Sequence, residues 1–227
     1  MREIVLDTET TGFDPLTGHR VVEIGCLELL NHVATGNEFH TYLDPQRDMP
    51  PDAEAVHGLS TPFLADKPLF GAIVDDLLGF IGDSPIIAHN ASFDLNFINA
   101  ELKRVNRQTL SSDRTIDTVT LARRKFPGAQ ASLDALCRRF QIDTSDRAKH
   151  GALLDAKLLS KVYLELIGGR EPGLALAATE AGGTQLIVQE KTTRPPRDHA
   201  PTPAESAAHA KFIAALKNAV WLQAENT

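Results

Sequence analysis

The sequence predicts an α/β fold in which a mixed sheet is flanked by helices and followed by a flexible C-terminal tail. Strand-like segments come first along the chain and then alternate with segments of helical periodicity. After residue 169 the composition shifts to Ala, Gly, Thr and Pro, which is typical of a flexible linker. Hydrophobic residues make up 42% of the 227 residues, enough to bury a sizeable core before that point.

Each element of this fold is predicted from its local pattern of apolar residues. Short apolar runs predict strands over residues 3–7, 21–30, 39–43, 85–88 and 115–118. Apolar residues at helical spacing predict helices over residues 70–81, 93–105, from 132 onward and 151–167. The helix that begins at Ser132 would turn Leu133, Leu136 and Phe140 toward the core, and Gly168-Gly169 would end the helix over residues 151–167. Pro50, Pro51 and Pro62 indicate loops and helix starts.

The composition also limits where the protein works and what it binds. No apolar run is long enough to cross a membrane, the N-terminus lacks the pattern of a signal peptide, and Cys26 and Cys137 are expected to be buried free thiols. These features predict a cytoplasmic protein without a membrane partner. The formal net charge is −7, whereas proteins that bind nucleic acid unaided are usually basic. Either the substrate is not nucleic acid, or metal ions or a partner supply the affinity.

Two acidic residues, Asp7 and Glu9, follow the first apolar strand directly. Side chains two positions apart in a strand point to the same face, so these carboxylates would lie side by side. They would repel each other and resist burial unless a cation lay between them. Carboxylate oxygens suit Mg²⁺ or Mn²⁺. A solvated strand end is the alternative interpretation of this pair.

Three further residues can join this pair. Asp94 follows the strand over residues 85–88 at a strand-to-helix junction, where a helix N-terminus would also favour an acid. His150 and Asp155 are five residues apart, and in one regular helix they would face different directions. If His150 precedes the helix and Gly151 permits the turn, both side chains can converge on one cleft. Four acids and one histidine then fit hydrolysis of a phosphodiester by two metal ions, with the histidine taking the proton from water.

Three motifs resemble those of the DEDDh 3′→5′ exonucleases, in the same order. The first is Ile4-Val5-Leu6-Asp7-Thr8-Glu9-Thr10-Thr11-Gly12, the second is His89-Asn90-Ala91-Ser92-Phe93-Asp94, and the third is His150-Gly151-Ala152-Leu153-Leu154-Asp155-Ala156. The resemblance covers about residues 2–169 and implies a ribonuclease-H-like fold. Within that family, Val56-His57-Gly58, Ser132-Leu133-Asp134-Ala135-Leu136-Cys137 and Lys149-His150-Gly151 are similar to the proofreading epsilon subunits of bacterial DNA polymerase III.

The resemblance implies roles for individual residues. Asp7, Glu9, Asp94 and Asp155 would bind two divalent ions, Mg²⁺ or Mn²⁺, and His150 would be the general base. Thr8, Asp52 and His57 match positions that line the terminal nucleotide, together with Asp7, Glu9 and Asp155. Asp52 lies in a loop whose sequence departs from the one usual in the family, and His57 could instead have a structural role.

The resemblance also implies a division of the chain into three parts. These are an exonuclease domain over residues 1–169, a linker over 170–203 and a helical segment over 204–227 that docks on the polymerase catalytic (alpha) subunit. In the last part, an apolar stripe would be formed by Phe212, Ile213, Leu216, Val220 and Trp221. Packing of this stripe back on the domain is the alternative. Residues 171–176 are similar to a sliding-clamp-binding peptide, although Glu171 stands where such peptides begin with Gln.

The motifs leave the substrate open. Enzymes that trim RNA or short oligonucleotides share the four acids and the histidine, and a binding module that kept the fold but lost catalysis is a second alternative. The linker and the docking segment favour a proofreader that acts on the 3′ end of DNA. The basic clusters at residues 103–104, 123–125 and 138–139 are expected on solvated helix faces, with one or two of their side chains on the DNA backbone.

Overall fold

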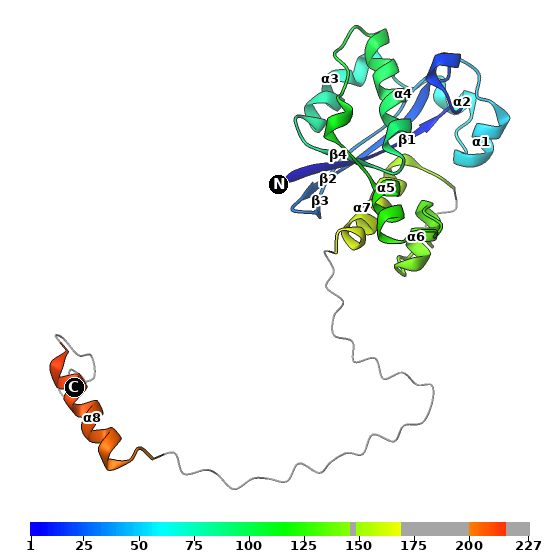
Figure 1. Ribbon diagram of the computed structural model, residues 1–227. Coiled ribbons are helices and arrows are strands. Elements are labelled where there is room, and N and C mark those ends of the chain that lie inside the picture. Colours follow the sequence, from blue (N-terminus) through cyan, green and yellow to red (C-terminus); the bar gives the residue numbers. More distant parts are fainter. Residues whose placement is uncertain (146–148, 169–199, 217–227) are drawn as a thin grey trace, which may run out of the picture. The chain divides into compact units, whose positions relative to one another are not determined.

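A mixed five-stranded sheet forms the centre of the fold (Figure 1). The computed structural model describes residues 1–145, 149–168 and 200–216. The strands are β1 (Arg2–Thr10), β2 (Val21–Leu30), β3 (Val33–Tyr42), β4 (Ile86–Ala88) and β5 (Thr115–Asp117). Their order is β3-β2-β1-β4-β5, in which β1, β2 and β3 are antiparallel neighbours while β4 and β5 run parallel to β1. The predicted mixed sheet is therefore confirmed.

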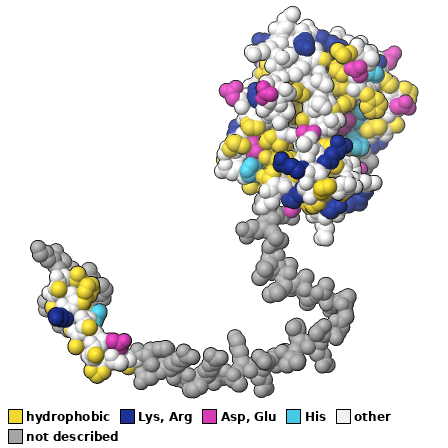
Figure 2. Space-filling model, in the orientation of Figure 1, with side chains coloured by type: hydrophobic (Ala, Val, Ile, Leu, Met, Phe, Trp, Pro, Cys, Tyr) yellow, Lys and Arg dark blue, Asp and Glu magenta, His cyan; other side chains and the backbone are white. Residues whose placement is uncertain are grey.

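Helices cover both faces of this sheet. One face packs against α3 (Phe70–Ile81) and α4 (Ala91–Arg104). The other packs against α5 (Thr118–Lys125), α6 (Leu133–Arg139) and α7 (Ala152–Leu166). Beside the sheet lie α1 (Pro51–His57) and α2 (Thr61–Leu64), and two short 3₁₀ turns are η1 (Pro15–Thr17) and η2 (Ser112–Arg114). In the same orientation, Lys and Arg side chains gather over the part of the surface that holds α5 and α6 (Figure 2).

Alternation along β1 explains why the molecule has two separate apolar cores. Ile4 and Leu6 face α3 and α4, whereas Val5 faces α5, α6 and α7. Both cysteines are buried as predicted, with Cys26 in the first core and Cys137 in the second.

Several predicted boundaries differ from those observed. β1 runs on to Thr10 because its pairing with β2 continues to Val21, so Glu9 lies within the strand and not beyond it. β3 begins at Val33 because it pairs with β2 directly after the turn at Asn31 and His32. The sequence did not predict α5, whose start depends on the Asp117 side chain accepting a hydrogen bond from the Val119 backbone N–H.

A β-bulge interrupts the β1–β2 pairing at the functional end of the sheet. Glu9 pairs with Glu23, but the next residue, Thr10, pairs with Val21, which leaves Val22 as the extra residue. Val22 packs instead with Met49 and Leu64 in a small third core below α1 and α2. Bulges next to active sites redirect side chains in this way, and here the bulge attaches the α1–α2 layer to the end of the sheet.

The start of α7 is set by a close approach to β2. A Cβ atom on Gly25 would lie 2.3 Å from the backbone nitrogen of Leu153, so only glycine allows this contact. Gly151, the N-cap of α7, has a φ of −160°, an extended conformation open to any residue. Gly151 thus permits this turn without being required for it, and the residue that the geometry requires is Gly25. Gly168, with a φ of +81°, follows the end of α7 as predicted.

The described C-terminal helix is α8 (Pro203–Ala215), which lies in a second unit of the chain, residues 176–227. It begins with a capping box between Thr202 and Glu205, and none of its residues is buried. α8 falls within the predicted helical segment over 204–227 except for its first residue, and it ends where Leu216 takes an extended backbone conformation. Short helices without tertiary packing fray readily at their ends. Residues 170–199 of the predicted linker, including the clamp-like peptide at 171–176, lie outside the described residues, as do Val220 and Trp221.

No helix within residues 1–145, 149–168 and 200–216 is long and apolar enough to cross a membrane.

We predict that Gly25→Ala destabilises the protein by about 1–3 kcal/mol, because the added methyl group would push α7 away from β2. Thermal unfolding would measure this, with a fall of roughly 2–4 °C for each kcal/mol in a domain of this size. The matched control is Gly79→Ala on the exposed face of α3, where a Cβ atom meets nothing within 4 Å. There alanine should stabilise the helix by up to about 1 kcal/mol. Equal effects at the two positions would contradict the close approach.

Candidate active site

Asp7 and Glu9 lie on β1 at the end of the sheet where the bulge begins. The strand alternation turns both side chains toward the face covered by α7, the same face as Val5. Asp7 pairs with Gly25 across the β1–β2 ladder. The glycine that admits α7 is therefore the direct neighbour of the first carboxylate, and the start of α7 comes close to Asp7.

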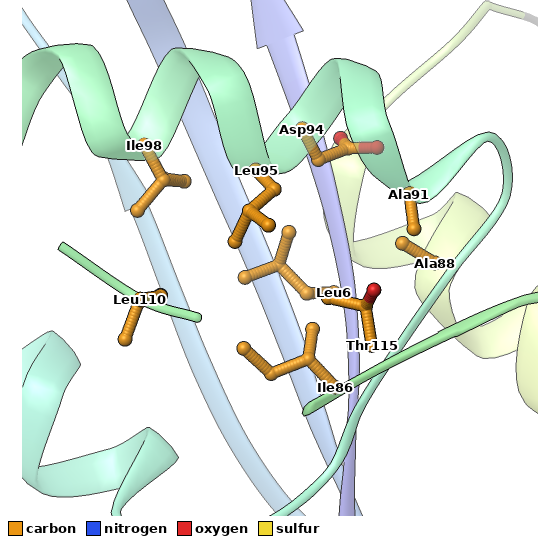
Figure 3. A pocket seen from close by; sticks show the side chains of 9 residues that line it. All are labelled: Leu6, Ile86, Ala88, Ala91, Asp94, Leu95, Ile98, Leu110 and Thr115. Carbon is orange, nitrogen blue, oxygen red and sulfur yellow. The ribbon is translucent and has the colours of Figure 1, made fainter. Parts of the chain in front are cut away.

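Asp94 reaches the site from α4. Leu95 and Ile98 of this helix point toward Leu6 and Ile86 of the sheet, and the Asp94 side chain lies at the end of this apolar contact (Figure 3). Asp94 is buried, and its Oδ1 accepts a hydrogen bond from the Thr8 hydroxyl at 2.7 Å. Thr8 thus fixes the Asp94 carboxylate against β1, close enough to Asp7 for its charge to raise the pKa of Asp7.

His150 and Asp155 come together across the start of α7. Asp155 is the fourth residue of the helix and His150 precedes the N-cap, as the sequence predicted. The Nδ1 atom of His150 lies 3.1 Å from the Oδ2 atom of Asp155, whose side chain is only 5% exposed, against 46% for the histidine. A ligand atom from each of Glu9, His150 and Asp155 lies within 4.8 Å of the others. This group has the size of a cation-binding site.

Electrostatic effects show that all four acids share one site. Burial raises the pKa of Asp7 well above its usual value, and the negative charges of Asp94, Glu9 and Asp155 raise it further. Burial also raises the pKa of Asp94 from 3.8 to about 7, against the opposing effect of its hydrogen bond from Thr8. Buried like charges are unfavourable unless a cation neutralises them. The carboxylate oxygens of these four acids are the ligands that hard divalent cations accept.

A pocket of about 350 Å³ opens beside Glu9. The predicted residues Thr8, Asp52 and His57 all line it, with Asp52 exposed on α1 and His57 buried at the end of the same helix. The other lining residues are Thr10, Thr11, Gly12, Phe13, His19, Pro50, Ala53, Val56 and Phe93. The pocket is large enough for part of a nucleotide, and one of its walls is the acidic site.

His57 presents a buried hydrogen-bond donor to this region. Its Nδ1 atom accepts a hydrogen bond from the Leu59 backbone N–H at 3.0 Å, which places the ring proton on Nε2. Within the described residues, Nε2 is buried and has no hydrogen-bond partner of normal geometry. Burial lowers the pKa of His57, partly opposed by the Thr10 backbone and the Glu23 charge. The neutral ring is thus held with its N–H group near the Thr10 backbone, in a contact that falls short of normal hydrogen-bond geometry.

Two sets of contacts hold the walls of the pocket. The His19 ring lies against Gly12, where a Cβ atom would come within 2.3 Å of it, and His19 Nδ1 is 3.1 Å from the Thr11 hydroxyl. The adjacent Arg20 makes a two-pronged ion pair with the buried Glu101 of α4, at 2.6 and 2.8 Å. The segment after β1 is thereby fastened to the helix that carries Asp94.

The sequence did not predict the parts played by His19, Phe13 and Phe93 in this pocket. His19 reaches it only through its packing on Gly12, a contact without a local signature. Phe13 is 90% exposed in a turn, and this exposure of a large apolar side chain is visible only in the structure. Phe93 lies at the start of the predicted helix over 93–105, and its ring also contacts that of Phe97.

Comparisons with known proteins show the family of this chain. The family model for Exonuclease matches residues 4–163. The DNA polymerase III subunit epsilon of Rickettsia felis is 48% identical over 222 residues, which cover 95% of this chain and 97% of the relative. The chain belongs to the DNA polymerase III epsilon family of exonucleases. Membership of this family confirms the predicted exonuclease activity.

Solved structures support the fold of this epsilon-family exonuclease. Exonuclease X in complex with 5′ overhanging duplex DNA is 25% identical, with a TM-score of 0.57 over 73% of this chain and 91% of that one. The nuclease domain of 3′hExo, a DEDDh family member bound to rAMP, is 15% identical, with a TM-score of 0.64 over 74% and 92% of the two chains. The predicted ribonuclease-H-like fold is therefore confirmed.

We predict that Asp94→Asn stabilises the metal-free protein at pH 8 but not at pH 4. Because the folded-state pKa of Asp94 is raised to about 7, its ionised form is penalised only in the folded state. The stability present below about pH 4 is therefore lost as the pH rises through 7. Asparagine removes this penalty, which is on the order of 1 kcal/mol or more.

Urea unfolding in the presence of a chelator would measure this difference. Asp76→Asn on the exposed face of α3 serves as the control carboxylate and should show no such dependence on pH. A stabilisation by Asp94→Asn that is equal at both pH values would contradict the proposed burial of charge.

Proposed function

We propose that this epsilon-family exonuclease removes mismatched 3′-terminal nucleotides from DNA as the proofreading subunit of a replicative DNA polymerase. In this proposal Asp7, Glu9, Asp94 and Asp155 hold two divalent cations, Mg²⁺ or Mn²⁺, and His150 is the general base. The observation that carries it is the clustering of Glu9, His150 and Asp155 within 4.8 Å, in a chain nearly half identical to an epsilon subunit.

The acidic site fits such cations by its chemistry. Its donors are carboxylate oxygens, the ligands that Mg²⁺ and Mn²⁺ prefer. The raised pKa of Asp7 reports repulsion among these groups, which bound cations would relieve. When bound, a pair of divalent cations stabilises both the attacking and the departing oxygen of a phosphodiester.

The chain's own groups supply the proton transfer. With the Asp155 carboxylate accepting from Nδ1 of His150, the basic lone pair of the ring lies on Nε2. His150 is half exposed, so that Nε2 can take a proton from a water molecule that attacks the terminal phosphorus. Asp155 fixes the ring and stabilises its protonated form.

The pocket beside Glu9 receives the terminal nucleotide in this proposal. Thr8 and Asp52 line it, and the Nε2–H group of His57 donates to an acceptor of the sugar or base. Phe13 and Phe93 offer rings on which a base can stack, an interaction tolerant of sequence. Such tolerance suits an enzyme that must remove any of the four nucleotides.

The C-terminal part of the chain supplies the partners. Residues 204–227, including the exposed Phe212 of α8, bind the polymerase catalytic (alpha) subunit, and residues 171–176 bind the sliding clamp. Tethering keeps the nuclease at a high effective concentration near the primer end without strong affinity of its own. The protein would work in the cytoplasm, where the chromosome is copied.

We predict Mg²⁺-dependent release of mononucleotides from the 3′ end of a mismatched DNA primer. His150→Ala should lower kcat by about 10²–10⁴-fold, because it removes the general base. Asp155→Ala should abolish cleavage without unfolding the protein, because it also relieves repulsion among the acids. A gel assay with DNA and a length-matched RNA, with and without Mg²⁺, would measure these rates.

His209→Ala on the exposed surface of α8 is the matched control and should keep full activity. Equal or faster cleavage of the RNA would favour the alternative of an enzyme that trims RNA or short oligonucleotides. If neither the DNA nor the RNA is cleaved, the nuclease proposal is contradicted and a binding module is favoured.

We predict that deleting residues 204–227 leaves cleavage of free single strands unchanged but abolishes binding to the polymerase catalytic subunit. Phe212→Ala should weaken binding, because Phe212 is a large apolar side chain that is 62% exposed on α8. Ser206→Ala on the same helix is the control. Co-elution with the purified catalytic subunit would test this, and full binding by the truncated chain would refute the docking role.

A further inference from the structure

The arginines of this protein fall into two groups. Outside α5 and α6, each described arginine is held by carboxylates or backbone carbonyls. These contacts are Arg2 with Glu28, Arg20 and Arg104 with Glu101, Arg47 with the Gly18 carbonyl, Arg107 with Asp75, and Arg114 with the carbonyls of Gly82 and Ser84. Their charges are thus neutralised or occupied within the fold.

The arginines of α5 and α6 differ from this group. Arg123, Arg124 and Arg138 are exposed and make no hydrogen bond or ion pair within the described part of the chain. Arg139 lies over the ring of Phe126 at 4.5 Å and is also exposed. We call these four residues the arginine surface. By contrast, the neighbouring Lys125 is bound to the carbonyls of Glu165 and Leu166 at the end of α7.

The arginine surface lies close to the acidic site along α5. Asp117 caps α5, and its charge contributes to the raised pKa of Asp94. Arg123 and Arg124 follow six and seven residues later, or about 10 Å along a helix that rises 1.5 Å per residue. Figure 2 shows Lys and Arg gathered over this part of the surface. A strand that rises about 3.4 Å per nucleotide would cross this distance in roughly three nucleotides.

In an acidic protein, exposed guanidinium groups without an internal partner indicate a binding surface for an anion. The chain carries a net charge of −7, so four uncompensated arginines on two adjacent helices form a local exception. Guanidinium groups match the geometry of phosphate by paired hydrogen bonds, and backbone contacts of this kind position a nucleic acid without reading its sequence. A phosphodiester backbone that ends in the acidic site must pass over a neighbouring surface, and this one is positively charged.

We propose that the arginine surface binds the phosphodiester backbone of the DNA strand a few nucleotides upstream of the 3′ end that is cleaved. This inference rests on the proposed nuclease function and adds a binding surface to it. The contacts hold the strand in place while successive terminal nucleotides are removed. They affect long substrates, whereas a single nucleotide in the pocket does not reach them.

The test compares Arg123→Gln/Arg124→Gln with Lys103→Gln/Arg107→Gln. Both double variants remove two positive charges, but the control pair lies at the end of α4 on the opposite face of the sheet. The substrates are a 20-nucleotide single strand and the p-nitrophenyl ester of thymidine 5′-monophosphate, each assayed with Mg²⁺ over a range of salt concentrations.

We expect the α5 variant to hydrolyse the ester at the wild-type rate but to show a several-fold higher KM for the long strand at low salt. The slope of log KM against log salt should fall by about 1.4, or 0.7 for each lost contact with a single strand. Arg123→Lys/Arg124→Lys should keep most of this slope, because the charges remain. The control pair should change neither KM nor slope.

Three results would overturn the proposal. The first is an unchanged KM and salt slope in the α5 variant, and the second is an equal change in the control pair. The third is loss of ester hydrolysis, which would assign the arginines to the fold or to the chemistry.

If the α5 variant cleaves normally but no longer binds the polymerase, the surface fits an acidic protein and not DNA. Inactivity of the wild type on both substrates would instead refute the nuclease function itself.

Discussion

Repulsion among buried carboxylates is the constraint on which the rest of the domain depends. Asp7, Glu9, Asp94 and Asp155 come from three different elements, and burial and mutual charge raise the pKa of Asp7. Because these carboxylates repel one another in the absence of a cation, contacts elsewhere in the fold must hold them together. The scaffold uses the long β1–β2 ladder, the Thr8–Asp94 hydrogen bond and the contact of α7 with Gly25. Each of these lies within one or two residues of a carboxylate.

The small α1–α2 layer links the histidine to the pocket. The His150 backbone N–H donates to the Val56 carbonyl at 3.4 Å, and a Cβ atom on Gly58 would meet the side chain of Lys149 at 2.7 Å. The same helix carries His57 and Asp52 into the pocket. A nucleotide that shifts α1 would therefore also shift His150. The bulge at Val22 attaches this layer to the sheet and thereby places both functions near Glu9.

Local patterns predicted much of this arrangement but not the contacts that enforce it. Alternation along a strand was enough to place Asp7 and Glu9 on one face, and the break before α7 was enough to bring His150 to Asp155. Gly25 was not recognised, because its role depends on a helix that follows more than a hundred residues later. The wall formed by His19 and the extension of β1 to Thr10 escaped prediction for the same reason. Residue type and short spacing report which groups can react, whereas long-range packing decides how closely they meet.

The negative net charge and the affinity for a polyanion are compatible because the charges are separated in space. The acidic groups at the end of β1 need cations, and those cations attract the one phosphate that reacts. The other phosphates of a strand would meet a surface of net charge −7 unless positive groups were left unpaired where the strand passes. Internal ion pairs neutralise Arg2, Arg20 and Arg104, whereas the arginines on α5 and α6 are left to bind an external anion. Under the proposed function, a tethered enzyme would gain from such moderate affinity, because it would have to release the primer end to the polymerase after each correction.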